Sequence, residues 1–178
     1  MPATLCSVSC PTSAASLAVL GQCAAFVASL PTRAYTAPST VLFGATIGQH
    51  VRHSLDHFAA ALLTGPGEAI DYDHRERGTP IESDPAAAAG LMAQLRDVLE
   101  GLTPAAAGRS VRVRVMLTSA GDETELGSTL ERELAFASHH AVHHHAMMAA
   151  IANELRHPVP AGFGKAPSTL NHERSATR

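Results

Sequence analysis

The chain has 178 residues, 46% of them hydrophobic and 16% charged, and its formal net charge is −3. This composition fits one globular domain with its own core and excludes a disordered chain. Aromatic content is only 4%, Trp is absent and no basic patch stands out, so a nucleic-acid-binding surface is not expected.

A first helix is expected from Thr12 or Ser13 to about Leu30, where Pro31 ends it. The N-terminal region has no basic segment, and its apolar run is interrupted by Ser, Gly and Gln. We therefore expect a core helix, with no signal peptide and no segment near the roughly 20 apolar residues that span a membrane.

The three cysteines, Cys6, Cys10 and Cys23, lie near the N-terminus without CxxC spacing. An odd number of cysteines without a disulfide framework is typical of a reducing compartment, so a cytoplasmic location is expected. Cys23 is interpreted as a small core residue. None of the three is expected to take part in the chemistry.

A second helix is expected over residues 47–63, capped by Thr46 and stopped by a Gly-Pro-Gly sequence. His50, His53 and His57 follow the spacing i, i+3, i+7 and line one ridge beside its apolar stripe. Periodicity does not choose between the three imidazoles as a metal ligand, and we expect at most one of them to bind.

Residues 69–84 are polar and charged and are expected to form a long loop, for which a functional loop and a solvated one both fit. Within it, Tyr72, Arg75 and Arg77 are candidates to clamp an anionic substrate. A third helix is expected from residue 85 to about residue 102.

Residues 111–116 alternate strictly between apolar and polar side chains, which predicts a strand. A Gly-Asp turn follows, and residues 123–126 are expected to return as the second strand of a short hairpin. At the other end of the chain, residues 158–178 are rich in Pro and Gly and are expected to be irregular.

Residues 128–157 contain no Gly or Pro and predict one long last helix. Ser128 and Glu131 have the spacing of a capping box at its start. Glu133 could orient an imidazole of this helix, although a first-turn glutamate that is favoured by the helix dipole explains it as well.

Five of the eleven histidines lie within residues 138–145 of this last helix. On its helical wheel, His140 and His144 face inward, His139 and His143 point away from the core, and His145 flanks the other side of the buried stripe. An inward His-x3-His pair is the arrangement with which a helix places two imidazoles on one metal ion. A third ligand must then come from elsewhere.

These elements predict an all-α fold, an antiparallel four-helix up-and-down bundle with a small β-hairpin between helices three and four. We expect one domain over residues 1–178, with a core of about residues 12–157 and an irregular tail over residues 158–178.

Three stretches of the chain, residues 46–58, 131–146 and 166–170, resemble the DinB/YfiT-like superfamily of helical metalloproteins in their residues, order and spacing. The resemblance covers roughly residues 47–170. It implies a divalent metal, most often nickel or zinc, held by three histidines.

Carried over by this resemblance, His140 and His144 match the family's His-x3-His pair, and the helix-two ligand falls on His53. The helical wheel places His50 and His57 nearer the apolar stripe, which keeps His50 as the alternative third ligand. The resemblance also implies that Ser168 and Thr169 fold back over the site.

By the same resemblance, we expect a metal-dependent enzyme that activates a small thiol or water, similar to thiol S-transferases or hydrolases. No catalytic side chain is assigned. The expected partner is a small-molecule substrate, with a low-molecular-weight thiol as the candidate, and neither nucleic acid nor membrane. The alternative is a non-catalytic bundle that is stabilised by a metal or associated with stress. A homodimer is one assembly that the sequence leaves open.

Overall fold

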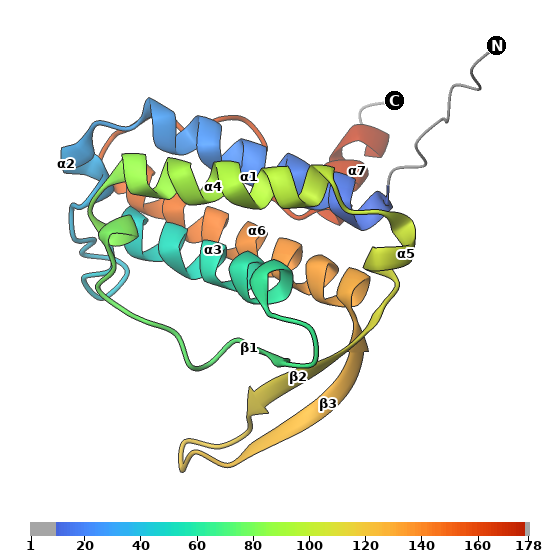
Figure 1. The fold of residues 1–178 in the computed structure, drawn as a ribbon. Coiled ribbons are helices and arrows are strands. Elements are labelled where there is room, and N and C mark those ends of the chain that lie inside the picture. Colours follow the sequence, from blue (N-terminus) through green and yellow to red (C-terminus); the bar gives the residue numbers. More distant parts are fainter. Residues whose placement is uncertain (1–9, 177–178) are drawn as a thin grey trace.

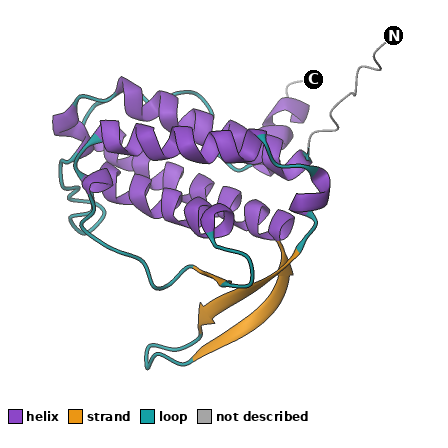
Figure 2. Ribbon diagram, in the orientation of Figure 1, coloured by secondary structure: helices purple, strands orange, loops and turns teal. Residues whose placement is uncertain are grey.

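The structure is a computed structural model that describes residues 10–176. Helices dominate the described part of the chain, and a small sheet lies beside them (Figure 2). Its four long helices are α1 (Pro11–Ser29), α3 (Ile47–Leu63), α4 (Pro85–Glu100) and α6 (Leu130–Glu154). Its short helices are α2 (Thr32–Tyr35), the 3-10 turn η1 (Pro80–Glu82), α5 (Pro104–Ala107) and α7 (Pro167–Ala176).

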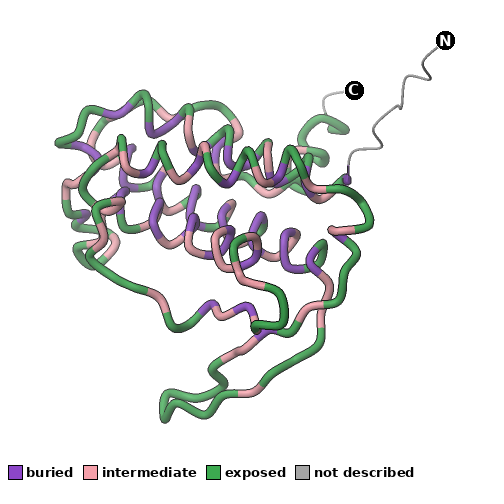
Figure 3. Tube along the Cα trace, viewed as in Figure 1, coloured by how far each residue is buried: buried purple, intermediate pink, exposed green. Residues whose placement is uncertain are grey.

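The four long helices pack around one hydrophobic core. Helix α6 contacts both α3 and α1, and α4 contacts the same two helices from the other side (Figure 1). Buried segments accordingly follow the inner faces of these helices, whereas the turn between the last two strands is exposed (Figure 3). Fully buried side chains from all four helices fill the core, among them Phe26, Phe58, Leu95 and Leu134.

Helix α3 begins and ends at the residues that the sequence predicts. The Thr46 hydroxyl accepts a hydrogen bond from the Gln49 backbone N–H (3.1 Å), and the Gln49 side chain accepts one from the Thr46 N–H (3.1 Å). This reciprocal pair satisfies two backbone donors that a helix start otherwise leaves without partners. The cap fixes where the first turn of α3, and therefore its histidines, must lie.

The start of α6 differs from the expectation by one residue. Thr129 is the cap, and its hydroxyl accepts from the Arg132 N–H, so the predicted capping box of Ser128 and Glu131 is wrong. Ser128 instead donates to the side chain of Glu133 at 2.5 Å. A cap at either position would leave the downstream histidines on the same helix face, because the helix itself sets their spacing.

The sheet has three strands, β1 (Ala69–Asp71), β2 (Ser110–Met116) and β3 (Glu123–Thr129). Strands β2 and β3 pair antiparallel from Ser110↔Thr129 to Met116↔Glu123, so the returning strand is longer than expected. Strand β1 pairs parallel with β2 and lies inside the segment predicted to be a loop, which is a correction. Three residues are too few for alternation to show in the sequence.

The tail also contains more structure than expected, because α7 forms within residues 158–178. Ahead of α7, Phe163 inserts its ring between Phe26 (4.4 Å between centroids) and His145 (4.6 Å). This apolar anchor holds the tail against α1 and α6. A Cβ at Gly164 would meet the backbone of α6 at 2.5 Å, so only glycine permits this approach.

Helix α1 begins at Pro11, slightly earlier than expected, and no side chain caps it. Contrary to the sequence expectation, α1 is long and apolar enough to cross a membrane by length and composition. A core helix meets the same criterion, and here α1 packs against α4 and α6. Cys23 lies in the core as expected, Cys10 is buried, and Cys6 lies outside the described residues.

Two helical glycines give a matched test of this packing. A Cβ at Gly48 of α3 would lie 2.0 Å from the Glu82 carbonyl oxygen and 2.7 Å from the Tyr35 ring, whereas one at Gly90 of α4 meets open space. We expect Gly48→Ala to lower the free energy of unfolding by about 1–3 kcal/mol through overpacking. Gly90→Ala should raise it by up to about 1 kcal/mol. Urea unfolding checks both; similar effects of the two changes would contradict the close contact of α3 with η1.

Candidate metal centre

Five imidazoles meet where α3 packs against α6. Helix α3 contributes His50, His53 and His57, and α6 contributes His140 and His144. The spacings i, i+3, i+7 and i, i+4 keep each set on one side of its helix. Because α3 and α6 pack side by side, the two sets face each other across the contact.

Three ring nitrogens of this cluster are nearly in contact. His140 Nε2 lies 3.0 Å from His53 Nε2 and 3.1 Å from His144 Nε2. A neutral imidazole carries one ring proton, so the single His140 Nε2 cannot form good hydrogen bonds with both neighbours at once. A cation among the three nitrogens would satisfy every lone pair, which is the property of a metal-binding donor set.

His57 is close to the same place but is held differently. Ligand-capable nitrogens of His53, His57 and His140 all lie within 4.8 Å of one another, so three histidines are positioned to hold a metal ion. However, His57 Nδ1 donates to the His53 carbonyl oxygen at 2.9 Å. Its ring is stacked between Tyr72 (5.0 Å, 11°) and His140 (4.0 Å, 25°).

His50, the alternative ligand from the sequence, lies on the other side of His144. The two Nδ1 atoms are 2.9 Å apart, so a hydrogen bond joins them when one of them carries a proton. His50 Nε2 is buried and has no hydrogen-bond partner in the described part of the chain. The structure thus places His50 against the far edge of the His144 ring.

The other histidines of α6 lie as the helical wheel predicts. His139 and His143 are exposed. His145 is buried on the opposite side of the helix, where it stacks on Phe163.

Glu133 does not orient an imidazole. It is buried and accepts hydrogen bonds from the Tyr72 hydroxyl (2.9 Å) and from Ser128. Burial and the Glu133 charge raise the pKa of Tyr72, which therefore keeps its proton and donates it to the carboxylate. This network fixes the ring that stacks on His57. Sequence reasoning missed it because its partners come from a loop and a helix 61 residues apart.

The expectation that Ser168 and Thr169 cover the site is wrong. Neither lines the cavity beside the histidines. Their neighbours Pro167 and Leu170 line a separate cavity between α1 and the His139 side of α6.

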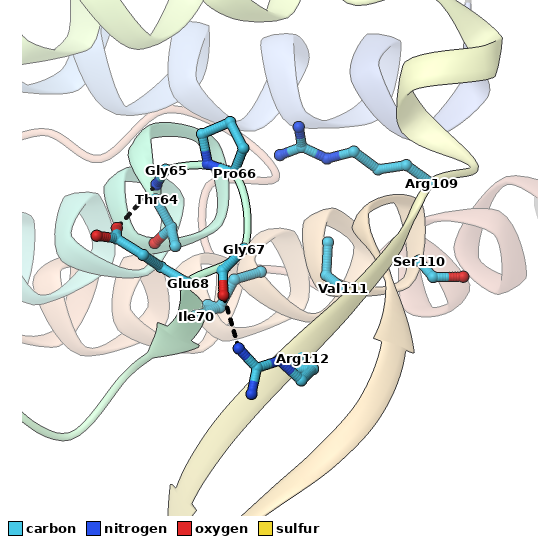
Figure 4. Close-up of a pocket in the computed structure, with 10 residues that line it drawn as sticks. All are labelled: Thr64, Gly65, Pro66, Gly67, Glu68, Ile70, Arg109, Ser110, Val111 and Arg112. Carbon is cyan, nitrogen blue, oxygen red and sulfur yellow. Dashed lines mark hydrogen bonds between the residues drawn. The ribbon is translucent and has the colours of Figure 1, made fainter.

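A third cavity, of about 340 Å³, lies between the turn after α3 and the start of β2 (Figure 4). There Arg112 donates to the Gly67 carbonyl oxygen at 2.6 Å, and Glu68 accepts from the Gly65 N–H. The residues that line it include no histidine or cysteine. The chemically distinctive groups of the described chain therefore gather at the α3–α6 contact.

Burial keeps the converging imidazoles neutral. Loss of solvation is the largest cause, and the charge of Arg75 and neighbouring histidines adds to it, so the pKa of His53 falls to about 3. Burial likewise lowers the pKa of His140 to about 4 and that of His144 to about 2. Neutral rings keep the lone pairs with which histidine coordinates metals.

These shifts make the stability of the metal-free protein depend on pH. The unfolded chain binds protons on histidine below about pH 6.5, whereas the folded cluster does not until much lower pH. The contribution of these histidines to the free energy of unfolding is therefore fully present above about pH 6.5. It should decrease as the pH falls from there toward 4. Urea unfolding of chelated protein at about pH 7.5, 6 and 5 measures this slope.

A matched pair of double variants identifies the groups responsible. His53→Gln/His144→Gln should flatten the slope, because it removes two of the buried groups. His139→Gln/His172→Gln should leave the slope unchanged, because both side chains are exposed. Equal stability of the unmodified protein at all three pH values would contradict the buried, neutral cluster.

Comparison with known proteins agrees with this architecture. A sequence profile of the DinB superfamily matches residues 19–148, which include α3, the sheet and most of α6. The chain is also 34% identical over 104 residues to a protein named FK506-binding protein 5 from Rhizopus delemar. That match covers 58% of this chain and 27% of the fungal protein, so the chain spans only about a quarter of this relative's length. On the extent of the profile match, the chain belongs to the DinB superfamily.

Proposed function

We propose that this chain binds a divalent metal, zinc or nickel, through Nε2 of His53, His140 and His144, and uses it as an enzyme on a small molecule. The observation that carries the proposal is the pair of short contacts, 3.0 and 3.1 Å, that join these three nitrogens. The four long helices then correspond to an antiparallel up-and-down bundle within a single domain, with β2 and β3 as its hairpin.

Ring orientation favours His144 over His57 as the third ligand. A nitrogen lone pair lies in its ring plane, so two nearly parallel, stacked rings cannot both point at one ion about 2.0–2.1 Å away. His57 and His140 are stacked in this way, at 25°. In contrast, the His144 ring is inclined by 59° to His140 and by 76° to His53.

His50 and His57 then act on the ligands rather than on the metal. With Nε2 of His144 given to the metal, its Nδ1 holds the proton and can donate to His50 Nδ1. His57 supports the flat face of His140 and is itself held by Tyr72 and by the His53 carbonyl oxygen. Such contacts fix the tautomer and orientation of a coordinating imidazole.

Three neutral imidazoles form the donor set of a catalytic site, because a four-coordinate ion keeps one position for water or substrate. No carboxylate or cysteine joins the histidine group within residues 10–176. A divalent metal held in this way lowers the pKa of a bound water or thiol and so supplies a nucleophile. We therefore propose a thiol S-transferase-like or hydrolase-like reaction on a small molecule in the cytoplasm, with a low-molecular-weight thiol as the candidate partner.

A second function is a metal-stabilised bundle without catalysis, as a monomer or homodimer. It is favoured by the position of the histidines, which would make the metal a cross-link between α3 and α6. If a paramagnetic ion replaces the bound metal, its effect on the relaxation of water protons shows whether the metal carries an exchangeable water. Such a water would support the enzyme. A closed coordination shell, with a large loss of thermal stability on chelation, supports the structural role. Light scattering tests the dimer.

Alanine variants test the ligands. His53→Ala, His140→Ala and His144→Ala should each weaken zinc binding by more than the roughly 10–100-fold typical of residues that only orient a ligand. His50→Ala and His57→Ala should fall within that smaller range. Competition with a chromophoric chelator, using protein without a histidine tag, gives the dissociation constants.

The exposed neighbours His139 and His143 are the matched controls, and their alanine variants should bind zinc as the unmodified chain does. Similar small losses at all positions would indicate a nonspecific histidine cluster. A loss at His57 larger than that at His144 would replace the proposed third ligand.

A further inference from the structure

A cavity of about 540 Å³ lies beside the histidines and is rich in arginine. His50, His53 and His144 line it, and so do Arg52 of α3 and Arg75 and Arg77 of the segment between β1 and η1. Glu82 is the only carboxylate among the residues that line it. This excess of positive charge is located where a substrate would approach the metal.

Arg52 is already neutralised within the fold. Its guanidinium pairs with Asp56 one turn further along α3, and its Nε lies 2.7 Å from a Glu82 oxygen. Arg52 is also buried. It therefore joins α3 to η1 and leaves no charge for a ligand to balance.

Arg75 and Arg77 have no such partners, because no carboxylate within residues 10–176 lies within ion-pair distance of either one. Arg75 Nη1 donates to the Tyr72 carbonyl oxygen, which fixes the side chain. Its Nε is buried and has no hydrogen-bond partner among the residues that the structure describes. Nε and Nη2 form the edge of a guanidinium that donates two parallel hydrogen bonds.

The segment that carries both arginines is held at each end. Before Arg75, Asp71 pairs with Arg114 in the sheet and accepts hydrogen bonds from the backbone of residues 73 and 74. After Arg77, the Gly78 N–H donates to Glu82, which is itself bound to Arg52. The arginines are thus positioned beside the histidines before any ligand arrives.

We propose that this cavity binds the carboxylate of a small organic acid, held side-on by Arg75 with Arg77 at the rim, while the reacting end of that molecule reaches His53 and His144. Only the placement of the reacting end beside His53 and His144 rests on the proposed function; the carboxylate site at Arg75 does not. A carboxylate fits the unpartnered edge because its two oxygens match two parallel N–H donors. It also gives the Arg75 guanidinium a direct ion-pair partner, which no carboxylate within residues 10–176 provides.

The first test needs no metal. Chelated full-length protein is titrated with propionate, and the Nε–H signal of Arg75 is followed by NMR. Propionate should shift this signal, and Arg75→Gln should bind propionate roughly tenfold or more weakly. Arg96→Gln, on the exposed face of α4, is the matched control and should bind as the unmodified chain does.

Neutral propionamide should leave the Arg75 signal unchanged. An equal response to propionamide, or unchanged propionate binding in Arg75→Gln, would overturn the proposal. Inorganic phosphate that binds as tightly as propionate would also overturn it, because the site would then accept any oxyanion.

The second test separates this inference from the proposed function. Cobalt-loaded protein is titrated with 3-mercaptopropionate and with its neutral amide, and the sulfur-to-cobalt absorption band reports binding. The acid should bind roughly tenfold more tightly than the amide, and Arg75→Gln should abolish only this difference. Equal binding of acid and amide would overturn the carboxylate site. Absence of the band with both ligands, beside a normal propionate response, would overturn only the proposal that a thiol binds the metal.

Discussion

The packing of α3 against α6 is the contact on which the rest of the structure depends. It partly buries the imidazoles of two helices, so protonating them is costly and their lone pairs stay free. The short contacts at His140 Nε2 cannot all be satisfied by ring protons. Metal binding and the stability of this helix pair are therefore expected to be coupled.

The sequence predicts those parts of the fold that local spacing determines. The start of α3 follows from the capping residues Thr46 and Gln49, and the strand from Ser110 follows from strict alternation. Strand β1 and helix α7 could not be found in this way. The first depends on pairing with Arg112–Arg114, and the second follows a tail anchored by Phe163 against α1 and α6.

The candidate site shows a similar division. Helical spacing places His140 and His144 on the inner face and His139 and His143 outside, but it cannot say which atom of a ring faces which neighbour. On the wheel, His57 lies nearer the apolar stripe than His53 and is indeed buried. Its Nδ1 donates to a backbone carbonyl oxygen, which leaves Nε2 free, but its ring is stacked on His140, so the two rings cannot both point at one ion. Depth of burial alone does not identify a ligand.

The segment after β1 shows no hydrophobic periodicity in the sequence, yet it connects the sheet to the histidines. Tyr72 supports the His57 ring, and Arg75 adds positive charge beside His53. The parallel pairing of β1 with β2 sets where this segment leaves the sheet, and Glu82 fixes where it returns to α3. The sheet thus acts as a support for one wall of the cavity. A change in β1 pairing would move Arg75 relative to the histidines without touching either helix. If the proposed function holds, this segment is the place where substrate preference can vary while the proposed metal centre is retained.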